Sequence, residues 1–121
     1  MRIANPTARL GEDAACKFLQ KLGYKIIDRN FRRGYGEIDI IAIFENTLVF
    51  VEVKTRTSEQ FGTPFEAITS PKIHSLIRTA QFYKQLKKGL PESLRIDAVS
   101  VILDQNKKIE SIEHIKNITG Y

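Results

Sequence analysis

The chain has 121 residues, 42% of them hydrophobic and 27% charged, which excludes a disordered or fibrous protein and predicts one globular domain over residues 1–121. The single cysteine excludes an internal disulfide, and the absence of a signal sequence or a membrane-length apolar run predicts a cytoplasmic protein with no membrane partner. A net charge of +5 favours a polyanionic partner, for which nucleic acid is the natural candidate.

A helix is predicted over residues 6–22, because Asn5 and Pro6 form a capping pair and Gly23 provides a stop. Glu12 borders the apolar side of this helix. A carboxylate in that position needs a partner, which is either a Lys or Arg of the same fold or a metal ion. The expected apolar stripe comprises Ala8, Ala15, Leu19 and Leu22, with Phe18 at its flank.

A short strand over residues 24–28 and a loop over residues 29–36 should follow. The loop interleaves arginines with aromatic residues and glycines, a composition suited to phosphate contacts and base stacking, although a solvated turn is the alternative. Glu37, just after the loop, could bind a second ion or pair with a neighbouring arginine. The candidate nucleic-acid contacts in this loop are Arg29, Arg32, Arg33 and Tyr35.

Two β-branched runs, residues 38–44 and 48–53, are separated by a short polar turn and predict an antiparallel hairpin. If Phe44 pairs with Thr47, Asp39 lies opposite Glu52, and Lys54 shares the face of Glu52. Two carboxylates about 5 Å apart would repel by roughly 3 kcal/mol at an effective dielectric of about 20. A cation is therefore expected between them.

The carboxylates of Asp39 and Glu52 suit a hard ion such as Mg²⁺ or Mn²⁺, with the Val53 carbonyl as a further ligand and Glu12 completing the site directly or through water. Lys54 would then orient or help to deprotonate an attacking water. The alternative is that the acid and lysine of this strand form an ordinary exposed face of alternating charge. The apolar residues around Glu52 favour the metal interpretation.

Residues 55–69 have no clear periodicity and predict a mobile loop able to close over a substrate, with Arg56 as a nucleic-acid contact. A second helix is predicted over residues 70–88, opened by Ser70 as its cap and by Pro71. Arg78 and Gln81 lie beside its apolar stripe as further candidate contacts. That stripe comprises Ile73, Leu76, Ile77, Ala80 and Tyr83.

Two strands, over residues 94–103 and 108–115, complete the chain, and the more polar second one should lie at a sheet edge. Asp97 falls inside the first of them. Pairing near Arg95 or with a backbone amide would explain this acid without catalysis, so we place it outside the candidate site.

Asp39, twelve further residues and then Glu52-Val53-Lys54 resemble the PD-(D/E)XK nuclease signature. With Gly11-Glu12, the segment RRGYGEIDIIA and the segment FVEVKTR, the chain resembles the YraN family and is similar to archaeal Holliday-junction resolvases. The resemblance implies an α/β, restriction-endonuclease-like fold, with a central mixed sheet of about five strands flanked by two main helices in the order α-β-β-β-α-β-β. Because such resolvases act as dimers, it also implies that a homodimer could form.

The resulting hypothesis is a Mg²⁺- or Mn²⁺-dependent endonuclease that hydrolyses phosphodiester bonds of nucleic acid, with DNA, including branched DNA, as the expected substrate. Its catalytic residues would be Asp39, Glu52, Lys54 and Glu12. The alternative is a nucleic-acid-binding module that keeps the nuclease fold without chemistry. That module would bind in a salt-sensitive way and without a metal requirement.

Overall fold

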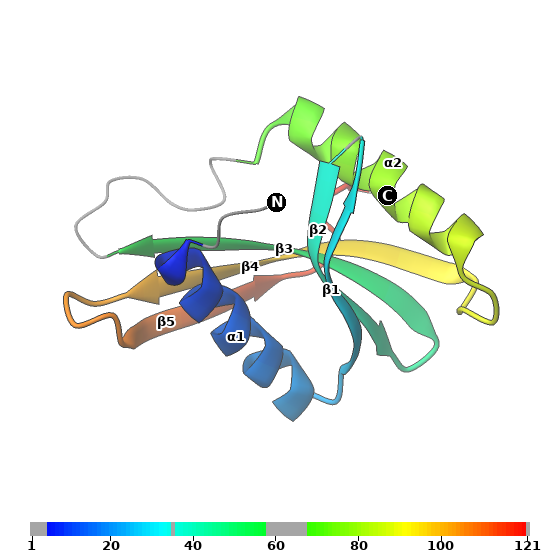
Figure 1. Ribbon diagram of the computed structural model, residues 1–121. Helices are drawn as coiled ribbons and strands as arrows, with labels where there is room; N and C mark the ends of the chain where they lie inside the picture. The colour runs from blue at the N-terminus through cyan, green and yellow to red at the C-terminus, as the bar shows by residue number, and fades with distance from the viewer. Residues whose placement is uncertain (1–4, 35, 58–67, 121) are drawn as a thin grey trace.

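The computed structural model describes residues 5–34, 36–57 and 68–120, which form a mixed sheet with two helices (Figure 1). The elements are α1 (Pro6–Lys21), β1 (Lys25–Arg33), β2 (Gly36–Phe44), β3 (Thr47–Thr57), α2 (Ser70–Leu86), β4 (Ser93–Leu103) and β5 (Ile109–Ile115). The five strands lie in the order β1-β2-β3-β4-β5, and this confirms the predicted α/β class and element order. None of the described helices has the length and apolar character needed to span a membrane.

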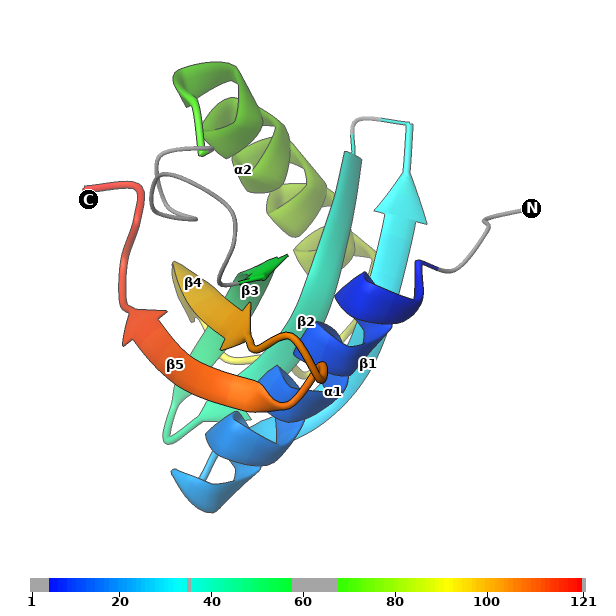
Figure 2. The same cartoon turned by 90° about the vertical axis from the view of Figure 1, so that its left-hand side faces the viewer.

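The sheet is mixed because β3 and β4 pair in parallel while the other neighbours are antiparallel. A parallel pair needs a crossover connection, and α2 lies in that connection. The helices cover opposite faces of the sheet (Figure 2), so each face buries its own apolar cluster. Leu19 of α1 packs in one cluster with Val51 and Val99, and Tyr83 of α2 packs in the other with Phe50 and Ile96.

Helix α1 begins as the sequence predicts and ends one residue earlier. The Asn5 side chain accepts hydrogen bonds from the backbone N–H groups of Thr7 and Ala8 at 2.9 and 3.3 Å. The prediction that Leu22 belongs to the buried stripe is wrong, because Leu22 lies past the last helical residue and is 51% exposed. Gly23 follows with φ of +97°, a conformation that turns the chain toward β1.

Helix α2 is capped by Thr69 rather than by Ser70, which is already helical. The Thr69 hydroxyl accepts a hydrogen bond from the Lys72 backbone N–H at 3.4 Å. Helix α2 ends at Leu86, two residues before the predicted end. The prediction of the capping residue is off by one position, because serine and threonine both favour the N-cap and are adjacent here.

Two predicted loops are partly wrong because pairing extends the strands. β1 continues to Arg33, with Arg29 opposite Ile40 and Arg33 opposite Gly36, so most of the predicted loop 29–36 is edge strand. Its polar composition reflects an edge position, where side chains meet solvent. β3 likewise continues to Thr57 along β4, and the rest of the predicted loop up to residue 67 lies outside the described residues.

Helix α1 packs very closely on β3 at Gly11. A Cβ atom placed at this glycine would overlap the side chain of Thr55. The close approach brings the next residue, Glu12, against the sheet beside the end of the β2–β3 hairpin.

Candidate metal and nucleic-acid site

The β2–β3 hairpin has the predicted register, with Phe44 opposite Thr47 and Ile40 opposite Val51. The paired ladder stops there, so Asp39 and Glu52 are the first residues beyond its last pair. The Asp39 carboxylate atom Oδ2 accepts a hydrogen bond from the backbone N–H of Val53 at 2.7 Å. At this point a side-chain carboxylate bridges the two strands in place of a backbone carbonyl, and β2 and β3 begin to separate.

Glu52 carries an unsatisfied acceptor in a buried position. The residue is 5% exposed, and Oε2 has no hydrogen-bond partner among the residues that the structure describes. The Nζ atom of Lys72, at the start of α2, lies 3.4 Å from this oxygen. That contact is an ion pair, and it does not count as a hydrogen bond to Oε2 among the described residues. A buried carboxylate oxygen in this state calls for an explanation, such as a proton shared with the neighbouring Asp39 carboxyl or a bound cation.

Asp39 and Glu52 interact electrostatically as the sequence predicts. Burial and, next, the negative charge of Glu52 raise the pKa of Asp39 from 3.8 to about 8, although the Val53 N–H group opposes this rise. The charge of Glu12 contributes in the same direction. The pair of carboxyl groups therefore retains a proton more readily than two separate carboxyl groups would.

Glu12 has partners inside the fold, as one of the two sequence interpretations supposed. Its Oε1 accepts a hydrogen bond from Asn30 Nδ2 at 2.7 Å and lies 3.8 Å from Arg29 Nη2. Within the described ranges, no three His, Cys, Asp or Glu side chains converge as metal ligands. A cation held by Asp39 and Glu52 would thus rest on two carboxylates and the Val53 carbonyl, with Glu12 acting from further away.

Lys54 lies two residues after Glu52 on β3 and is half-buried. In the part of the chain that the structure describes, its ammonium group has no ion pair or hydrogen bond. Together with Glu12 and Arg56, Lys54 lines a hollow of about 430 Å³ beside the start of α1. This lysine is therefore available to a molecule bound at the site.

The predicted nucleic-acid contacts differ in how free they are. Arg29 is bound to Asp13 at 2.8 Å, and Arg32 lies 3.7 Å from Glu37, which agrees with the ion-pair interpretation of Glu37. The Arg33 guanidinium lies over the rings of Phe31 and Phe82, 5.5 and 5.3 Å from their centroids.

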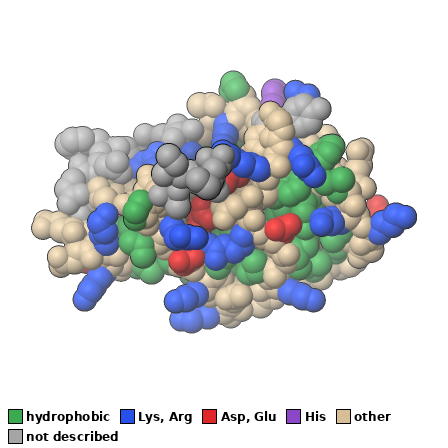
Figure 3. All heavy atoms as spheres, in the orientation of Figure 1, with side chains coloured by type: hydrophobic (Ala, Val, Ile, Leu, Met, Phe, Trp, Pro, Cys, Tyr) green, Lys and Arg blue, Asp and Glu red, His purple; other side chains and the backbone are tan. Residues whose placement is uncertain are grey.

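The remaining candidates lie on β3 and α2. Arg56 donates a hydrogen bond to the Thr55 carbonyl at 2.9 Å, Arg78 and Gln81 are exposed on α2, and Tyr35 lies outside the described residues. Figure 3 shows acidic side chains near the middle of one face with Lys and Arg side chains on several sides of them. Acidic and basic side chains thus share this face of the molecule.

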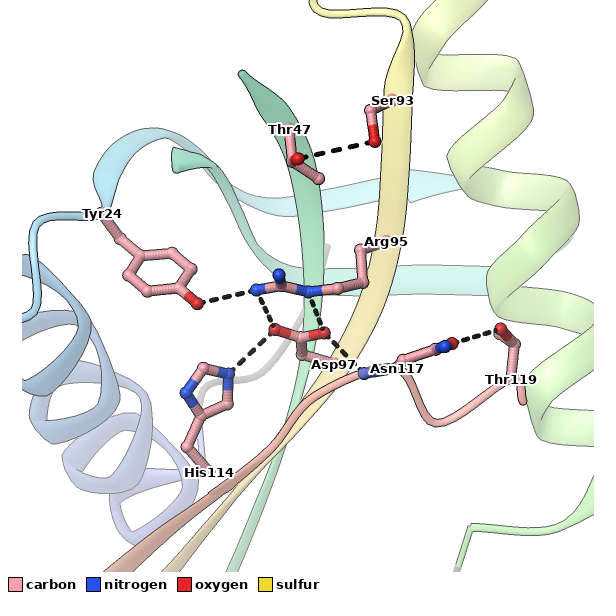
Figure 4. Close-up of polar contacts among 8 residues, drawn as sticks. All are labelled: Tyr24, Thr47, Ser93, Arg95, Asp97, His114, Asn117 and Thr119. Carbon is pink, nitrogen blue, oxygen red and sulfur yellow. Dashed lines mark hydrogen bonds and ion pairs between the residues drawn. The ribbon is translucent and has the colours of Figure 1, made fainter. Parts of the chain in front are cut away.

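Asp97 belongs to a separate buried network (Figure 4). Arg95 binds its carboxylate through Nε and Nη2, each at 2.9 Å, and the backbone N–H of Asn117 donates at 2.9 Å. Both partners agree with the sequence interpretation, but His114 Nε2, 2.8 Å from Oδ2, was missed. Only the presence of a histidine in an edge strand could have suggested it.

Fold and site define an α/β protein whose mixed five-stranded sheet holds a buried pair of carboxylates at the end of a hairpin ladder. The chain belongs to the Uncharacterised protein family UPF0102, which is the YraN family, because the model of that family matches residues 11–101. This membership confirms the family resemblance seen in the sequence.

Relatives of similar length support the same membership. The chain is 48% identical over 107 residues to a UPF0102 protein of Caldicellulosiruptor saccharolyticus, covering 88% of this chain and 91% of the relative. It is 42% identical over 109 residues to one of Caldanaerobacter subterraneus, covering 89% of each chain. A relative from Syntrophomonas wolfei is 44% identical over 108 residues, covering 88% of this chain and 91% of the relative.

Proposed function

We propose that this protein is a Mg²⁺- or Mn²⁺-dependent nuclease with a restriction-endonuclease-like, PD-(D/E)XK fold, acting on nucleic acid and preferentially on DNA, including branched DNA. The observation that carries the proposal is the buried pair of Asp39 and Glu52, in which Glu52 Oε2 lacks a hydrogen-bond partner within the described ranges. The pattern of Asp39, Glu52 and Lys54 supports it through its similarity to PD-(D/E)XK nucleases.

The residues present fit a hard divalent cation. Oxygen ligands are available from Asp39, Glu52 and the Val53 carbonyl, and the raised pKa of Asp39 reflects a surplus of negative charge that a cation would relieve. When bound, such an ion would polarise a phosphate and stabilise the charge that develops on it. Glu12 would act on the bound ion through its negative charge or through a bridging water molecule.

The protein's own side chains would hold the substrate and the water. In the hydrolysis, the oxygen of a water molecule bonds to phosphorus while one P–O ester bond breaks, leaving a phosphate monoester and a free hydroxyl. Lys54, with no partner among the described side chains, would donate hydrogen bonds to the attacking water or to a phosphate oxygen. Arg33, Arg56, Arg78 and Gln81 would contact the backbone on either side.

A cleavage assay tests the proposal. Labelled four-way junction, flapped and linear DNA, with a matched RNA, would be incubated with purified protein and Mn²⁺. We expect cleavage that is abolished by EDTA and reduced at least about a hundredfold in Asp39→Asn and Glu52→Gln. Glu92→Gln, which alters a fully exposed acid, serves as the control. Cleavage that persists in both site variants would refute the assignment.

The second candidate is a nucleic-acid-binding module without catalysis. It is favoured by the internal partners of Glu12 and by the lack of a third converging ligand in the described part of the chain. It predicts DNA affinity that is the same in EDTA and in Mn²⁺ and that falls with salt. Anisotropy titrations in both conditions distinguish the two functions, and light scattering with junction DNA would show whether two copies bind together.

A further inference from the structure

Lys72 has a charge of the wrong sign for its place in the fold. It lies in the first turn of α2, where the partial positive charge of the helix terminus favours acids, and this turn contains no acidic residue. Its ammonium group is directed instead to the neighbouring strand, with Nζ 3.4 Å from Glu52 Oε2. The position of Lys72 is therefore explained by Glu52 rather than by the helix.

The ion pair of Lys72 and Glu52 joins one exposed and one buried side chain at a long distance. The side chain of Lys72 is 37% exposed and that of Glu52 is 6% exposed, so the ammonium group lies on the solvent side of a buried carboxylate. Despite this contact, Glu52 Oε2 has no hydrogen bond from the described part of the chain. An ion pair with one exposed, flexible partner is weak and easily exchanged.

We propose that Lys72 is a positioning residue that changes partner: it neutralises Glu52 in the free protein and binds a substrate phosphate once a divalent cation occupies the carboxylates. This inference rests on the proposed function. A cation beside Glu52 repels the ammonium group, and the positive charge then gathered there, with Lys54 two residues along the same strand, attracts an anion. A phosphodiester brought to this point lies within reach of the displaced lysine.

The first test is Mn²⁺ binding without nucleic acid, measured by isothermal titration. Lys72→Gln removes the internal competitor for Glu52, so we expect Mn²⁺ affinity to rise about three- to tenfold. Lys88→Gln, at an exposed lysine just beyond α2, removes the same charge at a distance and should change the affinity less than twofold. A purely structural role for Lys72 would not strengthen metal binding.

The second test is DNA affinity, measured by anisotropy in EDTA and with Ca²⁺ replacing Mn²⁺. In EDTA, Lys72→Gln should bind almost as wild type, because the lysine is engaged with Glu52. With Ca²⁺, the variant should bind about three- to tenfold more weakly, and the slope of log K against log salt should fall by about one. Lys72→Arg should retain the DNA affinity of wild type. Lys88→Gln should change the DNA affinity by the same factor in EDTA and with Ca²⁺.

The outcomes separate this inference from the proposed function. Wild type that binds Mn²⁺, with Lys72→Gln equal to or weaker than wild type in metal affinity, overturns the role of Lys72 and leaves the nuclease proposal standing. Wild type that binds no Mn²⁺ overturns both. Opposite changes in metal and DNA affinity in Lys72→Gln, absent from Lys88→Gln, establish the exchange of partners.

Discussion

Replacing Asp39 with asparagine should make the protein more stable while removing its proposed activity. The carboxamide keeps an acceptor for the Val53 N–H group and adds a donor for the Glu52 carboxylate, with which the Asp39 carboxyl interacts. It also removes an ionisable group whose charged form the fold disfavours, since the pKa of Asp39 rises from 3.8 to about 8. One tenfold change in proton affinity corresponds to about 1.4 kcal/mol, so ionised Asp39 costs up to about 6 kcal/mol.

The sign of the pH dependence follows from the raised pKa. Between about pH 4 and pH 8 the folded protein holds a proton that the unfolded chain has released, so wild-type stability falls as the pH rises through this window. Asp39→Asn lacks this slope. Allowing for relaxation of the site, we expect Tm to be about 5–10 °C higher than that of wild type at pH 8.5 and nearly equal to it at pH 4.

Thermal unfolding followed by circular dichroism at several pH values measures this difference without any substrate or metal. Asp97→Asn provides a comparison in which the stability should depend on pH in the opposite direction. Burial raises the pKa of Asp97, but hydrogen bonds from His114, Arg95 and the Asn117 N–H lower it overall.

The stability contributed by Asp97 is therefore present above its unfolded pKa and lost as the pH falls through the lower folded pKa. Asp97→Asn should destabilise by about 3 kcal/mol near neutral pH and progressively less toward pH 3. If Asp39→Asn has a lower Tm than wild type at pH 8.5, or a Tm difference that does not change with pH, the reasoning about the carboxylate pair is refuted.

Three further changes test other parts of the molecule. Gly11→Ala should destabilise by about 1–3 kcal/mol in urea unfolding, because the new methyl group overlaps Thr55; an unchanged midpoint would contradict the close packing. Glu52→Gln should weaken Mn²⁺ binding at least about tenfold by isothermal titration, since one anionic ligand is lost, and wild-type affinity would remove Glu52 from the metal site. Arg33→Gln should lower DNA affinity and reduce the salt slope by about one, whereas an unchanged slope would show that Arg33 contacts no phosphate.

The sequence predicts the centre of the molecule well because the information there is local. Two β-branched runs joined by a short turn leave few registers, and pairing Phe44 with Thr47 proved correct. The same alternation places Glu52 on the face of Phe50, toward α2. Capping residues around Asn5 likewise define the start of α1.

The sequence predicts less where long-range pairing or a distant partner decides the outcome. β1 continues through an arginine-rich stretch because β2 pairs with it, and β3 continues to Thr57 because β4 lies alongside. Glu12 finds Asn30 on β1 and Asp97 finds His114 on β5, and no spacing in the chain links either pair. Lys72 shows the same limit, since only the packing of α2 brings it to Glu52.

Past Ile40 and Val51 the backbone ladder between β2 and β3 ends, and among the described strands the first part of β2 pairs along its backbone with β1. That two-stranded arm rises toward α2 (Figure 1), where Phe31 packs on Tyr83 with ring centroids 4.9 Å apart. Because Asp39 lies at the base of this arm, a change in the packing of the arm on α2 should also affect the carboxylate pair.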